Sequence, residues 1–248
     1  HEIAEQGIRI LNPFTPDKLA RVGDIVQPTA ATIMLDLCCG EGEMLCQWAS
    51  QYGLHGIGID LSHVFSANAR KRAAELGVSD QITIMQGDAA HYRDRLSDPA
   101  QQFDIVGCIG ATWIGDGLIG TLELMRPALK ESSDSLLLVG EPFWNMEPTA
   151  AVLEAMGFSA EMYLTLPGTL QRIRNAGYTL LSMVLADKNS WDRYEGDVWL
   201  NGFRWLEANP TDPDVAEFRN WLEGRQQSYC EIGRDYVGWG VFILRPTA

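Results

Sequence analysis

Acidic residues and glycines recur at the points where the apolar runs of this sequence end. Asp36, Asp60 and Asp88 each close such a run, and the first is followed by Gly40 and Gly42 in the stretch "LDLCCGEGEML". A glycine loop that leads into a helix lets backbone amides approach a ligand closely, as in nucleotide sites. Clustered carboxylates repel a pyrophosphate and attract a cation. These residues therefore favour a nucleotide-like ligand that carries positive charge.

The same loop could instead serve a dinucleotide. That fingerprint requires G-x-G-x-x-G, and Leu45 stands where the third glycine would let the helix pack closely. Glu41 and Glu43 add negative charge beside the place of the phosphates. An NAD-dependent oxidoreductase is therefore the weaker alternative.

The five cysteines match neither the spacing of a zinc site nor a framework of disulfides. Two of them are adjacent, and adjacent cysteines cannot easily bridge or share a tetrahedral site. Because free cysteine is among the most buried residue types, we interpret them as packing residues in a reducing cytoplasm. We predict no metal site. The five are Cys38, Cys39, Cys46, Cys108 and Cys230.

Four further residues could take part in catalysis. Glu141 closes another apolar run and could contact an acceptor or take a proton from it, or else bind backbone amides in a structural role. Trp113 could form the pocket wall beside a transferred group. His63 and His91 could act as bases, although a lone histidine near a loop is more often solvated or structural.

Alternating strand-like and helix-like segments must position these residues. Short apolar runs bounded by turn residues predict buried strands, and helical spacing of apolar residues predicts helices between them, one capped by Ser62. This alternation predicts a doubly wound α/β fold, with a parallel sheet and its ligand at the carboxyl ends of the strands. The strands are predicted at 31–37, 55–60, 81–88, 103–110 and 135–142, and the helices at 42–53, 62–77 and about 118–130.

Two stretches break this alternation within what we interpret as one domain, residues 1–248. A helical piece at 147–166 follows the fifth strand, and a block at 188–235 separates two further strands, at 178–187 and 236–244. The pattern of this block predicts two helices. The second would have Asp212 as its N-cap and Pro213 at its first helical position. Because both insertions start where a parallel strand ends, we predict that segments 143–166 and 188–235 form a helical lid. Trp191, Tyr194 and Trp199 would form mostly the core of this lid. Its apolar faces would equally suit contacts between copies in a homo-oligomer.

Composition and charge exclude several classes of partner. The chain of 248 residues carries a formal charge of −14, which opposes binding to nucleic acid or to an anionic membrane surface. No apolar run approaches the length of a membrane span, and no signal-like segment opens the chain, so we expect a cytoplasmic protein. The chain begins at His1 rather than Met, and we assign no role to its first residues.

Four motifs occur in an order and at spacings typical of one enzyme family. "LDLCCGEGEML", "GIGIDLS", "ITIMQGDAA" and "FDIVGCIGATWI" resemble the successive motifs of class I S-adenosylmethionine-dependent methyltransferases. The resemblance implies that Asp36, Gly40 and Gly42 line the methionine end of the cofactor. Cys38 stands where the family usually has glycine, which implies a slightly crowded loop. Asp60 would bind the ribose hydroxyls, Leu61 would lie beside the adenine, and Asp88 with Ala89 would hold the adenine edge. The end of the fourth strand would add Gly110 to the cofactor site.

The likeness extends over nearly the whole chain. "NPFTPDKLARVG", "GEPFW", "WDRYE", "RWLEANP" and "GWGVFIL" resemble a subgroup of bacterial small-molecule methyltransferases distantly akin to the ubiquinone and menaquinone methyltransferases. This implies a seven-stranded Rossmann-like sheet with its last strand antiparallel, and methyl transfer to a small-molecule acceptor that the resemblance does not name. A non-catalytic S-adenosylmethionine-binding protein on the same fold is the alternative, and Cys38 is its one argument.

Overall fold

The computed structural model describes residues 2–247, and its centre is a mixed β-sheet. Within these residues the sheet has seven strands in the order β3-β2-β1-β4-β5-β7-β6. All neighbours pair in parallel except β7, which runs antiparallel to both β5 and β6. The predicted doubly wound sheet with an antiparallel last strand is therefore confirmed. The strands are β1 (Ile33–Leu37), β2 (His55–Asp60), β3 (Ile82–Gln86), β4 (Ile105–Ile109), β5 (Leu136–Trp144), β6 (Tyr178–Leu185) and β7 (Val237–Pro246).

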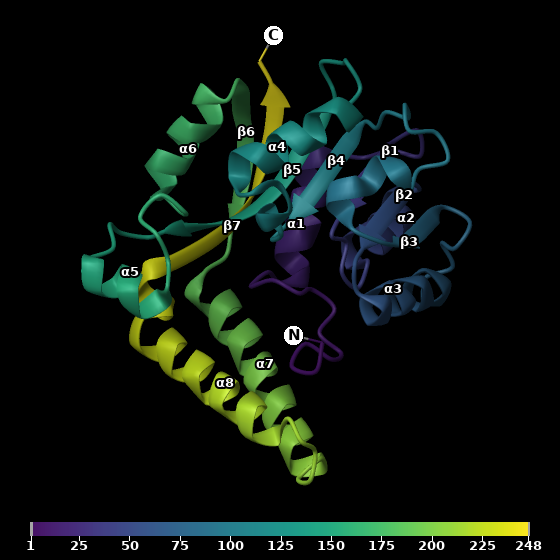
Figure 1. Cartoon of the computed structure of the whole chain (residues 1–248). Coiled ribbons are helices and arrows are strands. Elements are labelled where there is room, and N and C mark those ends of the chain that lie inside the picture. The colour runs from purple at the N-terminus through teal and green to yellow at the C-terminus, as the bar shows by residue number, and fades with distance from the viewer. Residues whose placement is uncertain (1, 248) are drawn as a thin grey trace.

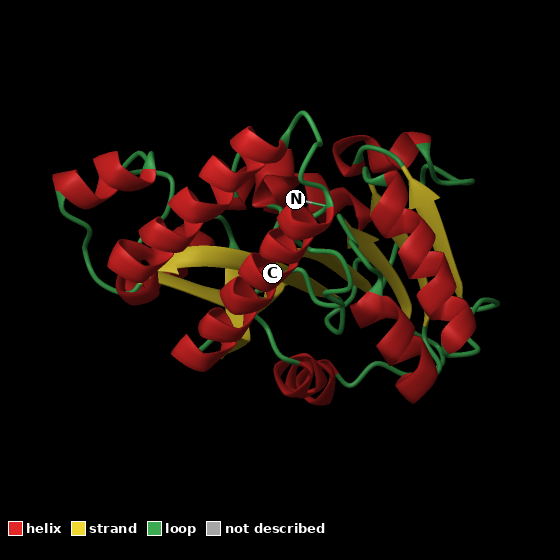
Figure 2. Ribbon diagram, turned by 90° about the horizontal axis from the view of Figure 1, so that it is seen from below, coloured by secondary structure: helices red, strands yellow, loops and turns green. Residues whose placement is uncertain are grey.

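Helices lie on both sides of the strands, as Figure 2 shows. Leu19 of α1, Leu45 of α2 and Ala69 of α3 belong to the apolar core on one face, and Leu122 of α4 and Ile173 of α6 belong to the core on the other. Both faces of the central strands β1, β4 and β5 are thus removed from water, which explains their nearly continuous apolar sequences. The helices are α1 (Pro16–Val26), α2 (Glu43–Tyr52), α3 (His63–Glu75), α4 (Leu118–Met125), α5 (Ala150–Met156), α6 (Leu166–Asn175), α7 (Lys188–Ala208), α8 (Val215–Ser228) and α9 (Arg234–Tyr236), with shorter turns η1 (Ala89–Asp94), η2 (Thr112–Gly115), η3 (Arg126–Ala128) and η4 (Tyr229–Gly233).

Helix termini follow the local chemistry, with one correction. Ser62 Oγ accepts a bond from Phe65 N at 3.0 Å, as its predicted capping role requires. The predicted cap at Asp212 is wrong, because α8 begins only at Val215 and Asp214 occupies the N-cap position. Asp212 Oδ1 accepts a bond from Asp214 N at 3.0 Å, so this carboxylate stabilises the preceding turn instead.

The block between β6 and β7 forms a helical hairpin beyond the sheet. In Figure 1, α7 and α8 lie side by side below the strands, and the N-terminus of the chain lies close to them. Asn201 Nδ2 of α7 donates to the carbonyls of Ala4 (3.3 Å) and Gln6 (2.8 Å), which joins the beginning of the chain to this hairpin. Among residues 2–247, no helix is long and apolar enough to cross a membrane.

Candidate functional site

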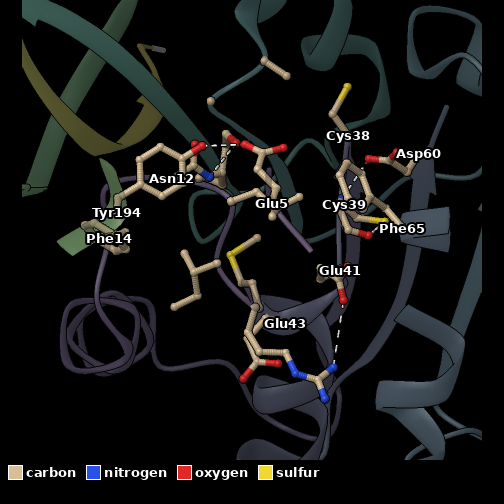
Figure 3. A pocket seen from close by; sticks show the side chains of 18 of the residues that line it. Glu5, Asn12, Phe14, Cys38, Cys39, Glu41, Glu43, Asp60, Phe65 and Tyr194 are labelled. Atoms are coloured by element: carbon tan, nitrogen blue, oxygen red, sulfur yellow. Dashed lines mark hydrogen bonds and ion pairs between the residues drawn. The ribbon is translucent and has the colours of Figure 1, made fainter. Parts of the chain in front are cut away.

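A cavity of about 780 Å³ lies where β1, β2 and β4 end. Its floor includes Asp36, Asp60 and Gly110 from the ends of these three strands. Residues 2–14, which we call the N-terminal segment, form a second wall, and residues of α1, α7 and α8 line further parts of the cavity. Figure 3 shows how residues of the strand ends and of the N-terminal segment converge on this space. The cavity therefore occupies the place that a doubly wound sheet offers to a ligand.

The loop after β1 bends sharply through three left-handed residues. Cys38, Gly40 and Gly42 have φ values of 58°, 54° and 68°. Glycine adopts this conformation freely, whereas a side chain there costs about 1–2 kcal/mol, so Cys38 strains the loop. Cys38 and Gly40 line the cavity, while a Cβ added to Gly42 would lie 2.8 Å from the Cβ of Ala69. Gly42 thus serves the packing of the loop against α3.

Asp60 is bound by two backbone amides. Its Oδ2 accepts from Gly40 N at 2.8 Å and its Oδ1 accepts from Ser62 N at 2.9 Å. Burial raises the pKa of this carboxyl and the two amide bonds oppose the rise. A carboxylate oxygen can accept more than one bond, so each oxygen keeps capacity for a further hydroxyl donor. Asp60 is therefore held rigidly in a form that suits a vicinal diol.

Asp36 closes β1 and is almost fully buried, with 3% of its surface exposed. Burial first, and repulsion from Asp60 second, raise the pKa of Asp36 to about 7. A positive charge in the cavity would stabilise its ionised form. The pair of carboxylates at the ends of β1 and β2 therefore favours a cationic ligand on electrostatic grounds.

Leu61, Asp88 and Ala89 are expected to contact the adenine, and of these three only Leu61 lines the cavity. Leu61 lines the cavity and exposes 63% of its surface. Asp88 is not among the lining residues; it accepts from Ala90 N at 2.9 Å and pairs with His91 Nδ1 at 3.0 Å. The Ala90 bond first, and the His91 bond second, lower the pKa of Asp88. Ala89 is buried in the core, so contacts of Asp88 and Ala89 with adenine stay predictions.

Glu141 lies behind the cavity wall and is not one of its lining residues. Its Oε2 accepts from Thr112 Oγ1 at 2.5 Å, and Thr121 Oγ1 donates to Thr112 O at 2.7 Å. Burial raises the pKa of Glu141 to about 7, against the bond from Thr112. The adjacent Trp113 does line the cavity. Glu141 therefore holds η2, the turn that carries Trp113, and its direct contact with an acceptor stays a prediction.

The remaining candidates divide between the cavity and its surroundings. His63 lines the cavity beside Leu61, whereas His91 pairs with Asp88 outside it. Trp191 and Tyr194 of α7 line the cavity, and Trp199 packs against Tyr229 with 5.7 Å between ring centroids. Of the two predicted lid segments, 188–235 contributes to the wall through α7 and α8, and no described residue of 143–166 lines this cavity.

Sequence reasoning missed the N-terminal segment. Asn12 Nδ2 donates to the carbonyl of Ile109 at 3.3 Å, and Ser62 Oγ donates to Glu2 Oε1 at 2.6 Å. A Cβ added to Gly40 would lie 3.0 Å from Leu11 Cδ1, so the segment also covers the glycine loop. The only available signal was the motif "NPFTPDKLARVG", which begins near its end.

Glu5 is the most enclosed carboxylate of this segment. It exposes 8% of its surface, and Tyr194 Oη donates to its Oε1 at 2.6 Å. Arg225 lies nearby but binds Glu195 through two nitrogens, at 2.7 and 2.8 Å. Burial raises the pKa of Glu5, and the Tyr194 bond and the charge of Arg225 oppose the rise.

Known proteins match both the sequence and the fold. Residues 34–132 match the family model described as a methyltransferase domain. The Escherichia coli protein named "Uncharacterized protein YjhP" is 43% identical over 98% of this chain and 96% of its own length. A solved S-adenosylmethionine-dependent methyltransferase from Geobacter sulfurreducens, in complex with S-adenosylhomocysteine, is 43% identical with a TM-score of 0.92, covering 99% of this chain and 96% of that one. Its counterpart from Thiobacillus denitrificans, also in complex with S-adenosylhomocysteine, is 44% identical with a TM-score of 0.91, covering 99% and 97%. The strand order, the cavity at the strand ends and these matches agree, and the chain belongs to the class I S-adenosylmethionine-dependent methyltransferases.

Proposed function

We propose that this protein is an enzyme that binds S-adenosylmethionine in the cavity and transfers its methyl group to a small-molecule acceptor. The observation that carries the proposal is Asp60, a buried carboxylate fixed by two backbone amides at the end of β2, with spare capacity for a vicinal diol. The two close relatives crystallised with S-adenosylhomocysteine support the same cofactor.

The described residues fit the parts of this cofactor. Asp60 would bind the ribose hydroxyls, and Leu61 would cover the adenine. The left-handed loop at Gly40 would lie beside the methionine part, with Gly110 at the end of β4 opposite. Asp36 would stabilise the positive charge of the bound cofactor.

Bound cofactor would supply a methyl group already activated by the sulfonium. The protein must then align the acceptor with that methyl group and exclude water. The N-terminal segment and α7 line parts of the cavity away from the strand ends. Trp113, which is 66% exposed on η2, would close the wall beside the acceptor. Catalysis would therefore rest chiefly on positioning.

Calorimetry with S-adenosylmethionine, S-adenosylhomocysteine and NAD tests the cofactor. We expect binding of the first two and none of NAD, because the acidic cavity opposes a pyrophosphate. Methyl transfer is then tested by mass spectrometry of a metabolite extract incubated with the protein and a donor carrying a deuterated methyl group. Failure of both sulfur compounds to bind would refute the proposal, and binding without any labelled product would support a non-catalytic binding protein.

A further inference from the structure

The part of the cavity that lies next to α1, α7 and β7 has an apolar and largely aromatic wall. The rings of Phe14 and Trp239 pack edge to face with 5.4 Å between centroids. Such a wall suits an acceptor with an apolar body, and the faces of its rings also attract a cation. The residues of this wall are Phe14, Leu19, Val22, Trp191, Tyr194, Trp239 and Val241.

The charges that line the cavity are unbalanced. Of its described lining residues, two are Arg or Lys, and both already have carboxylate partners: Arg9 pairs with Glu75 at 3.0 Å and Arg225 with Glu195 at 2.7 Å. Neither is available to pair with an acidic acceptor without losing its own partner. Six carboxylates line the same space. Glu43 pairs with Arg72 at 2.7 Å and Glu41 lies 4.0 Å from Arg9, whereas the other four have no ion pair with Arg or Lys among residues 2–247: Glu2, Glu5, Asp36 and Asp60.

Glu5 is the carboxylate that faces the aromatic wall. In Figure 3 it lies between Tyr194 and the loop at Cys38. Tyr194 donates to one of its oxygens, and within residues 2–247 no Lys or Arg nitrogen forms an ion pair with it. The Tyr194 bond and the charge of Arg225 offset only part of the cost of burying this carboxylate, because burial still raises its pKa. A cationic ligand or a proton would offset the rest.

We propose that the methyl acceptor is an amine, that Glu5 binds its ammonium form against the aromatic wall, and that Glu5 takes the proton that must leave before nitrogen is methylated. This inference rests on the proposed function above. An acceptor carboxylate or phosphate would meet Glu5 without a free cation to offset it, so anionic acceptors are disfavoured.

The ammonium group gives one proton to the Glu5 carboxylate, which leaves a lone pair on nitrogen and a neutral carboxylic acid on Glu5. Nitrogen then forms a bond to the methyl carbon as the carbon–sulfur bond breaks, and its electron pair stays on sulfur, which becomes a neutral thioether. The methylated nitrogen carries the positive charge, and Glu5 returns its proton to water. The buried setting that raises the pKa of Glu5 favours its taking this proton.

The test uses three probes of the same shape, benzylamine, benzyl alcohol and benzoate. Each is titrated by calorimetry into the full-length protein already saturated with S-adenosylhomocysteine, at neutral pH. We expect benzylamine to bind most tightly and benzoate most weakly. Benzoate binding as tightly as benzylamine, or no binding of benzylamine, would overturn the inference.

The variant Glu5→Gln keeps an acceptor for Tyr194 and removes the charge. We expect this variant to bind benzylamine about tenfold or more weakly, because the ammonium group loses a charged partner, and to bind benzyl alcohol with nearly unchanged affinity. The matched control is Glu223→Gln on α8, an exposed carboxylate 3.9 Å from Arg219, which should leave all three probes unchanged.

The cofactor titration separates the two proposals. If wild-type protein binds no S-adenosylhomocysteine, the proposed function fails and the acceptor inference fails with it. If it binds S-adenosylhomocysteine but shows no preference for the amine, only the acceptor inference fails. If Glu5→Gln weakens the binding of S-adenosylhomocysteine and of benzylamine by equal factors, the acceptor inference also fails, because Glu5 would then bind the ammonium group of the cofactor.

Discussion

Buried carboxylates in this protein are stabilised in two different ways. Asp60 keeps two backbone amide bonds at the end of β2, which favour its ionised form. No described residue donates a hydrogen bond to the Asp36 carboxylate, and burial raises its pKa to about 7. Glu141 has one bond from Thr112, and its pKa is also raised to about 7. Of these three carboxylates, only Asp60 has a backbone amide donor at each of its two oxygens, and these bonds oppose the rise that burial causes in its pKa.

Replacing Asp60 by Asn should weaken binding of S-adenosylhomocysteine at least tenfold. Asn has one carbonyl oxygen, so it can keep only one of the amide bonds from Gly40 and Ser62 and loses the charge that strengthens a hydroxyl contact. Calorimetry measures the affinity. Asp98→Asn is the matched control, because Asp98 Oδ1 also accepts a backbone bond two residues on, at 2.9 Å from Ala100 N, away from the cavity. An equal loss in both variants would contradict the prediction.

Glu141 should make the protein less stable as the pH rises from about 4.5 to about 7. Between its ordinary pKa of 4.5 and the raised value of about 7, the folded chain holds a proton that the unfolded chain has released. Folding is therefore favoured on the acid side of this window, and the advantage is lost as the pH rises through the folded pKa. Asp36 acts in the same direction.

The variant Glu141→Gln should flatten this dependence, since Gln stays neutral and can still accept from Thr112. At about 1.36 kcal/mol for each pKa unit, the flattening amounts to roughly 3 kcal/mol between pH 4.5 and 8. Urea denaturation at several pH values measures it. Glu131→Gln, in an exposed loop, is the control, and the same slope in both variants would count against a buried, neutral Glu141.

Much of the residue-level site could be predicted because strand ends are local features. Asp36, Gly40 and Asp60 follow from where apolar runs stop, and Leu61 follows from the family resemblance; the structure brings all four to the cavity. The direction of Glu141 could not be predicted in this way. It sits in a strand buried on both faces, where the alternation that would reveal the side of each residue is absent.

At the scale of elements, the N-terminal segment fits closely against the end of β4. Gly110 has φ of 84°, and a Cβ added to it would lie 2.1 Å from Asn12 Oδ1. Gly110→Ala should therefore destabilise the fold by about 1–3 kcal/mol and displace the segment. The double variant Gly110→Ala/Asn12→Ala should recover part of the lost stability. It removes the clash between the new Cβ and Asn12, while the strain of a left-handed alanine at position 110 remains.

Urea denaturation of the two single variants and the double variant measures this coupling. Gly77→Ala is the control for strain alone, since Gly77 has φ of 69° and nothing within 4 Å of an added Cβ. If the free energies of unfolding lost in Gly110→Ala and Asn12→Ala simply add in the double variant, the N-terminal segment does not pack against Gly110.

Elements fixed by local patterns could be predicted, and those fixed by distant contacts could not. The five first strands and the cap at Ser62 follow from periodicity and turn chemistry. The N-terminal segment is held by contacts such as that between Asn201 and Gln6, 195 residues apart, which leave no periodic trace in the sequence. The start of α8 was misplaced because Asp212 suits a turn as well as a cap.

At the scale of the whole molecule, the charge of −14 and the six carboxylates of the cavity should make the protein prefer S-adenosylmethionine to S-adenosylhomocysteine. The two ligands differ by the methyl group and the positive charge on sulfur. Salt screens such attraction, so the ratio of the two affinities should fall as the ionic strength rises. Calorimetry at low and high salt measures the ratio; a ratio that does not change would show that long-range charge plays no part.

The α7–α8 hairpin leaves the sheet from β6 and returns to it in β7, and these two strands are neighbours. The first and last residues of the hairpin are therefore held next to one another by two paired strands. The helices between them can change in length or composition without shifting the register of any strand. A graft of this hairpin from a related chain would exchange one wall of the cavity, and it would have to keep the contacts of Tyr194 and Asn201 with the N-terminal segment, which covers the glycine loop. The hairpin is therefore a part of the wall in which the shape offered to the second reactant can change while the seven strands keep their places.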